Sequence, residues 1–120
     1  MKSEYVITND ELMERNLDLN DYALTGDFVQ PIIDIALDIA ITRCCTLNDN
    51  FKGEQSVEQA LDSDSSLVVP FKKLQRRIIW NLLFMGQDDP IDPYIDNIIC
   101  HELGWGKING FQKGLYYRHN

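Results

Sequence analysis

The residues that could do metal chemistry begin with His101-Glu102, which matches the first half of the zinc-protease motif. That motif needs a second histidine four residues after the first, so that both imidazoles lie on one helical face and bind one zinc ion. Position 105 is Trp. The spacing therefore does not support a zinc site, and His101 is interpreted as a surface or half-buried helix residue.

A calcium loop is the second candidate, because Asn48, Asn50 and Gly53 occupy the first, third and sixth places of such a loop. Lys52 stands at a ligand position, and Gln59 replaces the glutamate that should bind the ion through both oxygens. A lysine among the ligands would repel a cation. We therefore reject a calcium site.

Catalytic and cofactor-binding patterns do not emerge elsewhere. Gly104, Gly106 and Gly110 do not complete a dinucleotide-binding G-x-G-x-x-G pattern, because position 109 is Asn. A group of aspartates stands beside two prolines and an expected helix start, where carboxylates act as caps: Asp88, Asp89, Asp92 and Asp96. We expect no enzyme, no cofactor and no bound metal.

The charge is unevenly distributed along the 120 residues, whose formal net charge is −8. Residues 1–69 carry fourteen Asp or Glu against four Lys or Arg, whereas residues 70–120 carry seven Lys or Arg against five Asp or Glu. An acidic surface of this size opposes general nucleic-acid binding. The asymmetry instead suggests that the two parts of the chain meet oppositely charged protein surfaces.

Helical patterns dominate the chain. Thr8-Asn9-Asp10-Glu11 has the form of a capping box, so a short helix should begin near Asn9. Asp27 can cap a long helix over residues 28–46, which is apolar on nearly every side except for a strip of Gln30, Asp34, Asp38 and Thr42. A short helix near residues 56–61 follows, and then a loop over residues 62–66.

The second long helix is expected over residues 71–85, with Pro70 as its first residue and Gly86 as its stop. Its apolar residues recur every three or four positions, and a basic cluster lies on the other side: Lys72, Lys73, Arg76 and Arg77. Asp92, Pro93 and Gly104 frame a third helix. Asn109-Gly110 is typical of a hairpin turn.

The expected fold class is therefore all-α, a small bundle of about four helices in which two long helices form the core. We expect residues 1–104 to form a helical domain and residues 105–120 to form a C-terminal hairpin or extended arm. Residues 28–47 contain two carboxylates and a guanidinium, so we expect no membrane segment. Residues 1–4 do not begin a signal peptide, so we expect the protein to stay in the cytoplasm where it is made.

The residues expected to contact other proteins come from three places. Four cations within residues 72–77 repel one another unless negative groups face them, and Asp34 and Asp38 pose the opposite problem on an otherwise apolar helix. One hypothesis is that the acidic half of one copy meets the basic helix of the next. The aromatic residues of the arm complete the set: Trp105, Phe111, Tyr116 and Tyr117.

The order of elements resembles that of a known family. The chain is expected to have a short helix, a long apolar helix, a polar loop, an amphipathic helix led by Val69-Pro70 with the run Phe71-Lys72-Lys73-Leu74-Gln75-Arg76-Arg77, and a last helix with a tail. This order is similar to that of the small head–tail connector proteins of tailed bacteriophages, which are also called adaptor or head-completion proteins. The resemblance covers most of residues 8–104 and is architectural, with motifs of low specificity.

The resemblance implies a helical bundle repeated as a ring, typically of twelve copies, in the neck of the virion between the portal and the tail or a second connector protein. DNA would pass through this ring without specific binding, and the terminal arm would contact the portal. The Asn109-Gly110 hairpin is a departure from the family pattern. The alternative that composition leaves open is an acidic protein that mimics DNA and inhibits or regulates a host protein.

Overall fold

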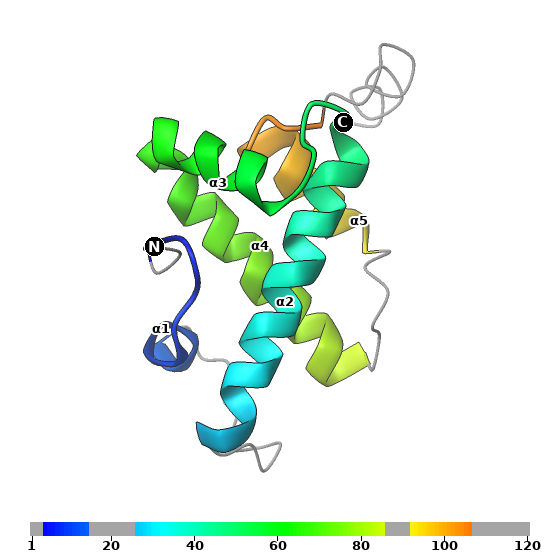
Figure 1. Cartoon of the computed structure of the whole chain (residues 1–120). Helices are drawn as coiled ribbons and strands as arrows, with labels where there is room; N and C mark the ends of the chain where they lie inside the picture. Colours follow the sequence, from blue (N-terminus) through cyan, green and yellow to red (C-terminus); the bar gives the residue numbers. More distant parts are fainter. Residues whose placement is uncertain (1–3, 15–25, 86–91, 107–120) are drawn as a thin grey trace.

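A computed structural model describes residues 4–14, 26–85 and 92–106, and in these ranges the chain is helical and contains no strand (Figure 1). The elements are α1 (Asn9–Glu14), α2 (Gly26–Leu47), α3 (Glu54–Ser63), a 3-10 turn (Ser65–Leu67), α4 (Val68–Trp80), which continues as wider π-helical turns (Asn81–Met85), and α5 (Pro93–Asn97), which continues in the same way (Ile98–Glu102). This arrangement confirms the expected all-α fold class with two long helices.

The helix starts show how far local signals determine the elements. Thr8 and Glu11 form the expected capping box, in which the Glu11 amide donates to Thr8 Oγ1 at 3.2 Å and the Thr8 amide donates to Glu11 Oε1 at 3.3 Å. At α5, the Asp92 carboxylate accepts from the Tyr94 amide at 2.9 Å, and Pro93 opens the helix as predicted.

Three boundaries differ from expectation. Helix α2 begins at Gly26, so Asp27 lies inside the helix rather than ahead of it. Helix α4 begins at Val68, which makes Pro70 its third residue, where the amide hydrogen that proline lacks still has no helical acceptor. The loop expected over residues 62–66 is shorter, because α3 extends to Ser63.

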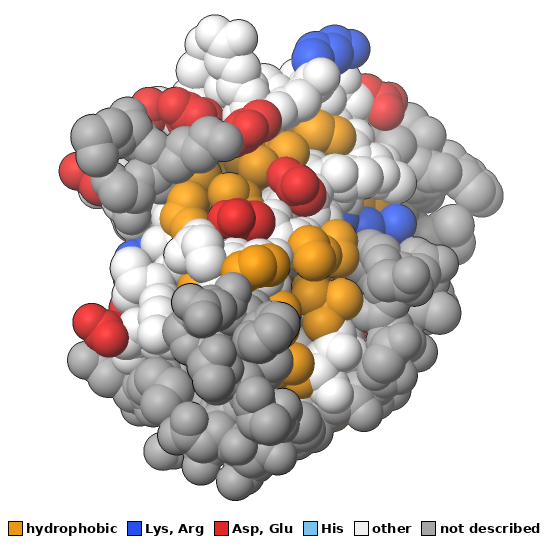
Figure 2. All heavy atoms as spheres, turned by 60° about the horizontal axis from the view of Figure 1, so that its bottom comes forward, with side chains coloured by type: hydrophobic (Ala, Val, Ile, Leu, Met, Phe, Trp, Pro, Cys, Tyr) orange, Lys and Arg blue, Asp and Glu red, His pale blue; other side chains and the backbone are white. Residues whose placement is uncertain are grey.

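The core lies between α2 and α4, which cross each other in Figure 1. The buried side chains recur every three or four residues along each helix: Ile33, Ala36, Leu37, Ala40 and Cys44 on α2, and Phe71, Leu74, Ile78 and Ile79 on α4. Figure 2 views the end where α2 begins and shows a band of apolar side chains interrupted by carboxylates, with Lys and Arg at its margins. The outer surface there is therefore mixed.

Trp105 corrects the expected boundary between the helical domain and the arm. Its indole is 7% exposed, and its ring centroid lies 5.0 Å from that of Phe51 and 6.2 Å from that of Phe71. Gly104 ends the preceding helix with a φ of +72°, and the Trp105 amide then donates to the Ile99 carbonyl at 2.8 Å. The chain turns back onto the core after the glycine, so Trp105 is a core residue and no part of an arm.

Gly106 continues this close packing, because a Cβ at that position would lie 2.2 Å from Cys100 Sγ. The expected arm residues Phe111, Tyr116 and Tyr117 and the Asn109-Gly110 turn lie outside the described residues.

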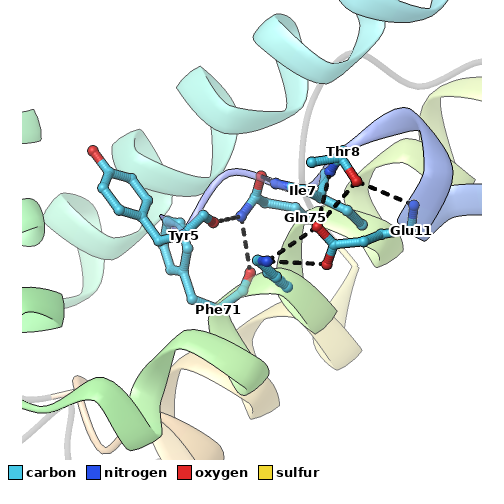
Figure 3. Close-up of polar contacts among 7 residues, drawn as sticks. Tyr5, Ile7, Thr8, Glu11, Phe71 and Gln75 are labelled. Carbon is cyan, nitrogen blue, oxygen red and sulfur yellow. Dashed lines mark hydrogen bonds and ion pairs between the residues drawn. The ribbon is translucent and has the colours of Figure 1, made fainter. Parts of the chain in front are cut away.

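The N-terminal segment is attached to α4 by one buried side chain, Gln75, which is 0% exposed (Figure 3). Its Oε1 accepts from the Ile7 amide at 3.1 Å, and its Nε2 donates to the Tyr5 carbonyl at 2.7 Å. The Tyr5 hydroxyl donates to Glu58 on α3 at 3.0 Å, and burial together with that carboxylate raises the pKa of Tyr5. Because buried backbone groups need partners, Gln75 sets where the segment before α1 lies.

Replacing Gln75 with methionine tests this role, because the two side chains have nearly the same shape. The variant leaves the Ile7 N–H and the Tyr5 C=O buried without a partner, which should lower the free energy of unfolding by roughly 2–4 kcal/mol. Urea denaturation measures the loss, and Gln59→Met, an exposed position on α3, is the matched control. Equal unfolding midpoints for the two variants would contradict the role assigned to Gln75.

Candidate interaction surfaces

His101 is exposed on the last helix, and within residues 4–14, 26–85 and 92–106 no group of three or more His, Cys, Asp or Glu side chains could hold a metal ion. Burial raises the pKa of Cys44, and it raises that of Cys100 to about 11, so both thiols are protonated at neutral pH. None of the described helices is long and apolar enough to cross a membrane.

Carboxylates of the same chain face the basic cluster of α4. Lys72 Nζ lies 3.0 Å from Glu11 Oε2 on α1, and Lys73 Nζ lies 2.9 Å from Glu102 Oε2 on the last helix. Burial favours a raised pKa for Glu11, but hydrogen bonds from Lys72 and Thr8 outweigh it and lower that pKa. These two cations therefore do not depend on a neighbouring copy for a counter-charge, which corrects that part of the sequence hypothesis.

Arg77 contacts two aromatic rings and a carboxylate. Its guanidinium lies 4.6 Å from the Trp80 ring centroid and 4.9 Å from that of Tyr94, and its Nε donates to Asp92 Oδ2. Asn81 also donates to that oxygen, at 3.1 Å. Although burial acts to raise the pKa of Asp92, the hydrogen bonds from Arg77, Tyr94 and Asn81 lower it. The arrangement holds a planar cation against two aromatic rings.

The outer side of α4 forms a continuous surface, which we call the α4 strip. Its members follow a spacing of three or four residues along α4, and one ring from α5 lies beside them: Val69, Lys73, Arg76, Arg77, Trp80 and Tyr94. Lys73 Nζ lies 5.5 Å from the Tyr94 ring centroid, which joins the two helices in one surface. Val69 is 68% exposed and Tyr94 42% exposed. Arginine and aromatic residues are the types that are enriched in protein interfaces.

The outer side of α2 forms the second surface, which we call the α2 strip. It consists of exposed residues that recur every three or four positions: Gln30, Pro31, Asp34, Ile35, Asp38 and Thr42. Ile35 is 48% exposed, and Gln30 Nε2 donates to Asp34 Oδ1 at 2.9 Å. Asp34 and Asp38 thus lie outside the core.

The two strips face away from each other. The buried residues of α2 and α4 point into one shared core, and each strip lies on the side of its helix opposite to that core. In the described part of the chain, the exposed large apolar side chains are Ile35, Val69 and Tyr94, and all three lie on these strips. The molecule therefore has two chemically different faces, one with exposed carboxylates and one with aromatic rings and cations that carboxylates of the same chain accompany.

Comparisons with known proteins give no family for this chain: no protein-family model matches it, no curated protein matches it, and no solved structure matches it.

Five of the interface residues predicted from the sequence lie on the two strips, Asp34 and Asp38 on the α2 strip and three members of the basic cluster on the α4 strip. The sequence prediction did not include the exposed apolar residues Ile35, Val69 and Tyr94. Ile95, Ile98 and Ile99 mark the inward side of the last helix, and Tyr94, four residues before Ile98, lies at the edge of that side, so the spacing alone does not identify it as exposed. Lys72 lies apart from the α4 strip and is paired with Glu11 on α1.

The lowered pKa of Asp92 makes a pH-dependent prediction. A carboxylate whose folded-state pKa is depressed contributes stability above its unfolded-state pKa, and this contribution disappears as the pH falls through the folded-state value. Asp92→Asn keeps an oxygen for the Tyr94 amide but removes the charge, so it should lower the free energy of unfolding by roughly 1–2 kcal/mol at pH 7 and progressively less in acid.

Denaturation between neutral and acidic pH measures this convergence, with the exposed substitution Asp62→Asn as control for the loss of one surface charge. A constant difference between wild type and Asp92→Asn at every pH would show that the Arg77–Asp92 pair does not act through its charge.

Proposed function

We propose that this chain is a structural subunit of the head–tail connector of a tailed bacteriophage, repeated as a ring in the neck of the virion between the portal and the tail or a second connector protein. The protein would be made in the host cytoplasm and would act by binding other protein surfaces, without catalysis. The observation that carries the proposal is the placement of Ile35, Val69 and Tyr94 on two strips that face away from each other.

Two unlike surfaces on opposite sides are what a ring requires. A two-fold dimer uses one self-complementary surface, whereas repeated head-to-tail contacts use two different surfaces and close into a ring when the rotation permits. A single exposed isoleucine or valine is common on a protein surface. Here the exposed apolar side chains lie beside carboxylates on the α2 strip and beside cations on the α4 strip, and this combination of apolar and charged groups suits a specific contact.

The negative charge suits a position around passing DNA. With a formal net charge of −8, the surface repels the phosphate backbone and does not retain it. The cations that could bind phosphate are partly occupied inside the chain, because Lys72, Lys73 and Arg77 all have carboxylate partners. DNA therefore would slide through the ring without specific binding.

Reconstitution tests the proposal. Purified protein is added to DNA-filled phage heads that carry the portal but lack this chain, and electron microscopy of the necks with nuclease protection of the packaged DNA is the measurement. We expect a ring of density on the portal and DNA that becomes protected. Absence of neck binding, together with a salt-independent monomer that inhibits a DNA-binding enzyme, would contradict the proposal and favour the DNA-mimic alternative.

A further inference from the structure

We propose that the α2 strip of one copy docks onto the α4 strip of the next copy, with Ile35 seated against Val69 and Tyr94. This inference rests on the proposed assembly of copies and names the contact that would build it. The occupant of each strip is a second copy of this chain, because the α2 strip of one copy complements the α4 strip of another.

Charge complementarity supports this pairing. Asp34 and Asp38 are exposed on the α2 strip, and the α4 strip presents Lys73, whose side chain is 42% exposed. The Lys73–Glu102 pair is a surface pair, with side chains 42% and 41% exposed, and such pairs contribute little to stability. Lys73 can therefore exchange or share its partner with a carboxylate from another copy at little cost.

Preorganisation supports it as well. Arg77 contacts the rings of Trp80 and Tyr94 and is bound to Asp92, so the aromatic part of the α4 strip is already ordered before docking. Surfaces that are rigid before they bind lose less conformational entropy on association. The contact then removes the exposed side chains of Ile35, Val69 and Tyr94 from water. This burial of apolar surface supplies favourable free energy of association that surface charges alone do not supply.

The direction of the strips fixes the type of assembly. Since the α2 strip and the α4 strip lie on opposite sides of one core, both strips of a copy cannot be covered by one partner. Each copy therefore contacts two neighbours, and the contact is heterologous.

Two single variants test the docking. Ile35→Lys places a cation opposite the basic strip, and Val69→Glu places a carboxylate opposite Asp34 and Asp38. Both positions are exposed, and a glutamate in the first turn of α4 is compatible with the helix. Gln59→Lys and Gln55→Glu add the same charges at exposed positions of α3 and serve as matched controls.

Light scattering after size exclusion and sedimentation velocity measure the association. We expect each strip variant to weaken self-association by roughly tenfold or more, while the α3 controls assemble like wild type. The decisive step is mixing: Ile35→Lys keeps an intact α4 strip and Val69→Glu keeps an intact α2 strip, so the mixture should form one-to-one pairs that neither variant forms alone.

Several outcomes would overturn the docking. The first is that both variants assemble as strongly as wild type. The second is that each variant alone loses assembly and the mixture also stays monomeric. The third is that wild type is monomeric at low salt and high concentration. A loss of unfolding free energy in Ile35→Lys without loss of association would mean that another part of the same chain covers the α2 strip. Neck binding by wild type in these cases would leave the connector proposal standing, so the two failures are distinguishable.

Discussion

The packing of α2 against α4 is the interaction on which the rest of the structure depends. Apolar side chains from both helices fill one core, and the other elements pack against α2, against α4 or against both helices. The N-terminal segment binds one side through Gln75, and α5 binds another through Arg77 and Asp92. The α4 strip is the side of α4 that still faces outward, and the α2 strip faces outward on the opposite side of the core.

The charges of the chain serve two levels of organisation. Within one copy, carboxylates distant in sequence neutralise the basic cluster and attach α1 and the last helix to α4, as the Lys72–Glu11 and Lys73–Glu102 pairs show. Asp34 and Asp38 are exposed on α2, where Asp34 accepts a hydrogen bond from Gln30 of the same helix. Their position beside the exposed Ile35 is the basis for proposing a contact between copies. The acidic excess that remains is the part consistent with a surface beside DNA.

Local sequence signals predicted most of the fold, because caps and periodicity are local. Thr8-Asn9-Asp10-Glu11 and Asp92-Pro93 begin helices as expected, and the periodicity of residues 71–85 identified a buried side and an outer side. Trp105 could not be placed in this way, since its burial depends on the turn at Gly104 and on Phe51 and Phe71, which are distant in sequence. The counter-charges of Lys72 and Lys73 were missed for the same reason: their partners lie 61 and 29 positions away.

The central claim is that copies of this chain join through two unlike strips, and a cryo-electron microscopy structure of the assembled protein tests it most directly. We expect the same contact to repeat around the assembly, with α2 of each copy lying along α4 and α5 of its neighbour and with Ile35 buried at every junction. An assembly held by two-fold contacts of one strip with itself, or one that leaves Ile35, Val69 and Tyr94 exposed to solvent, would contradict the account.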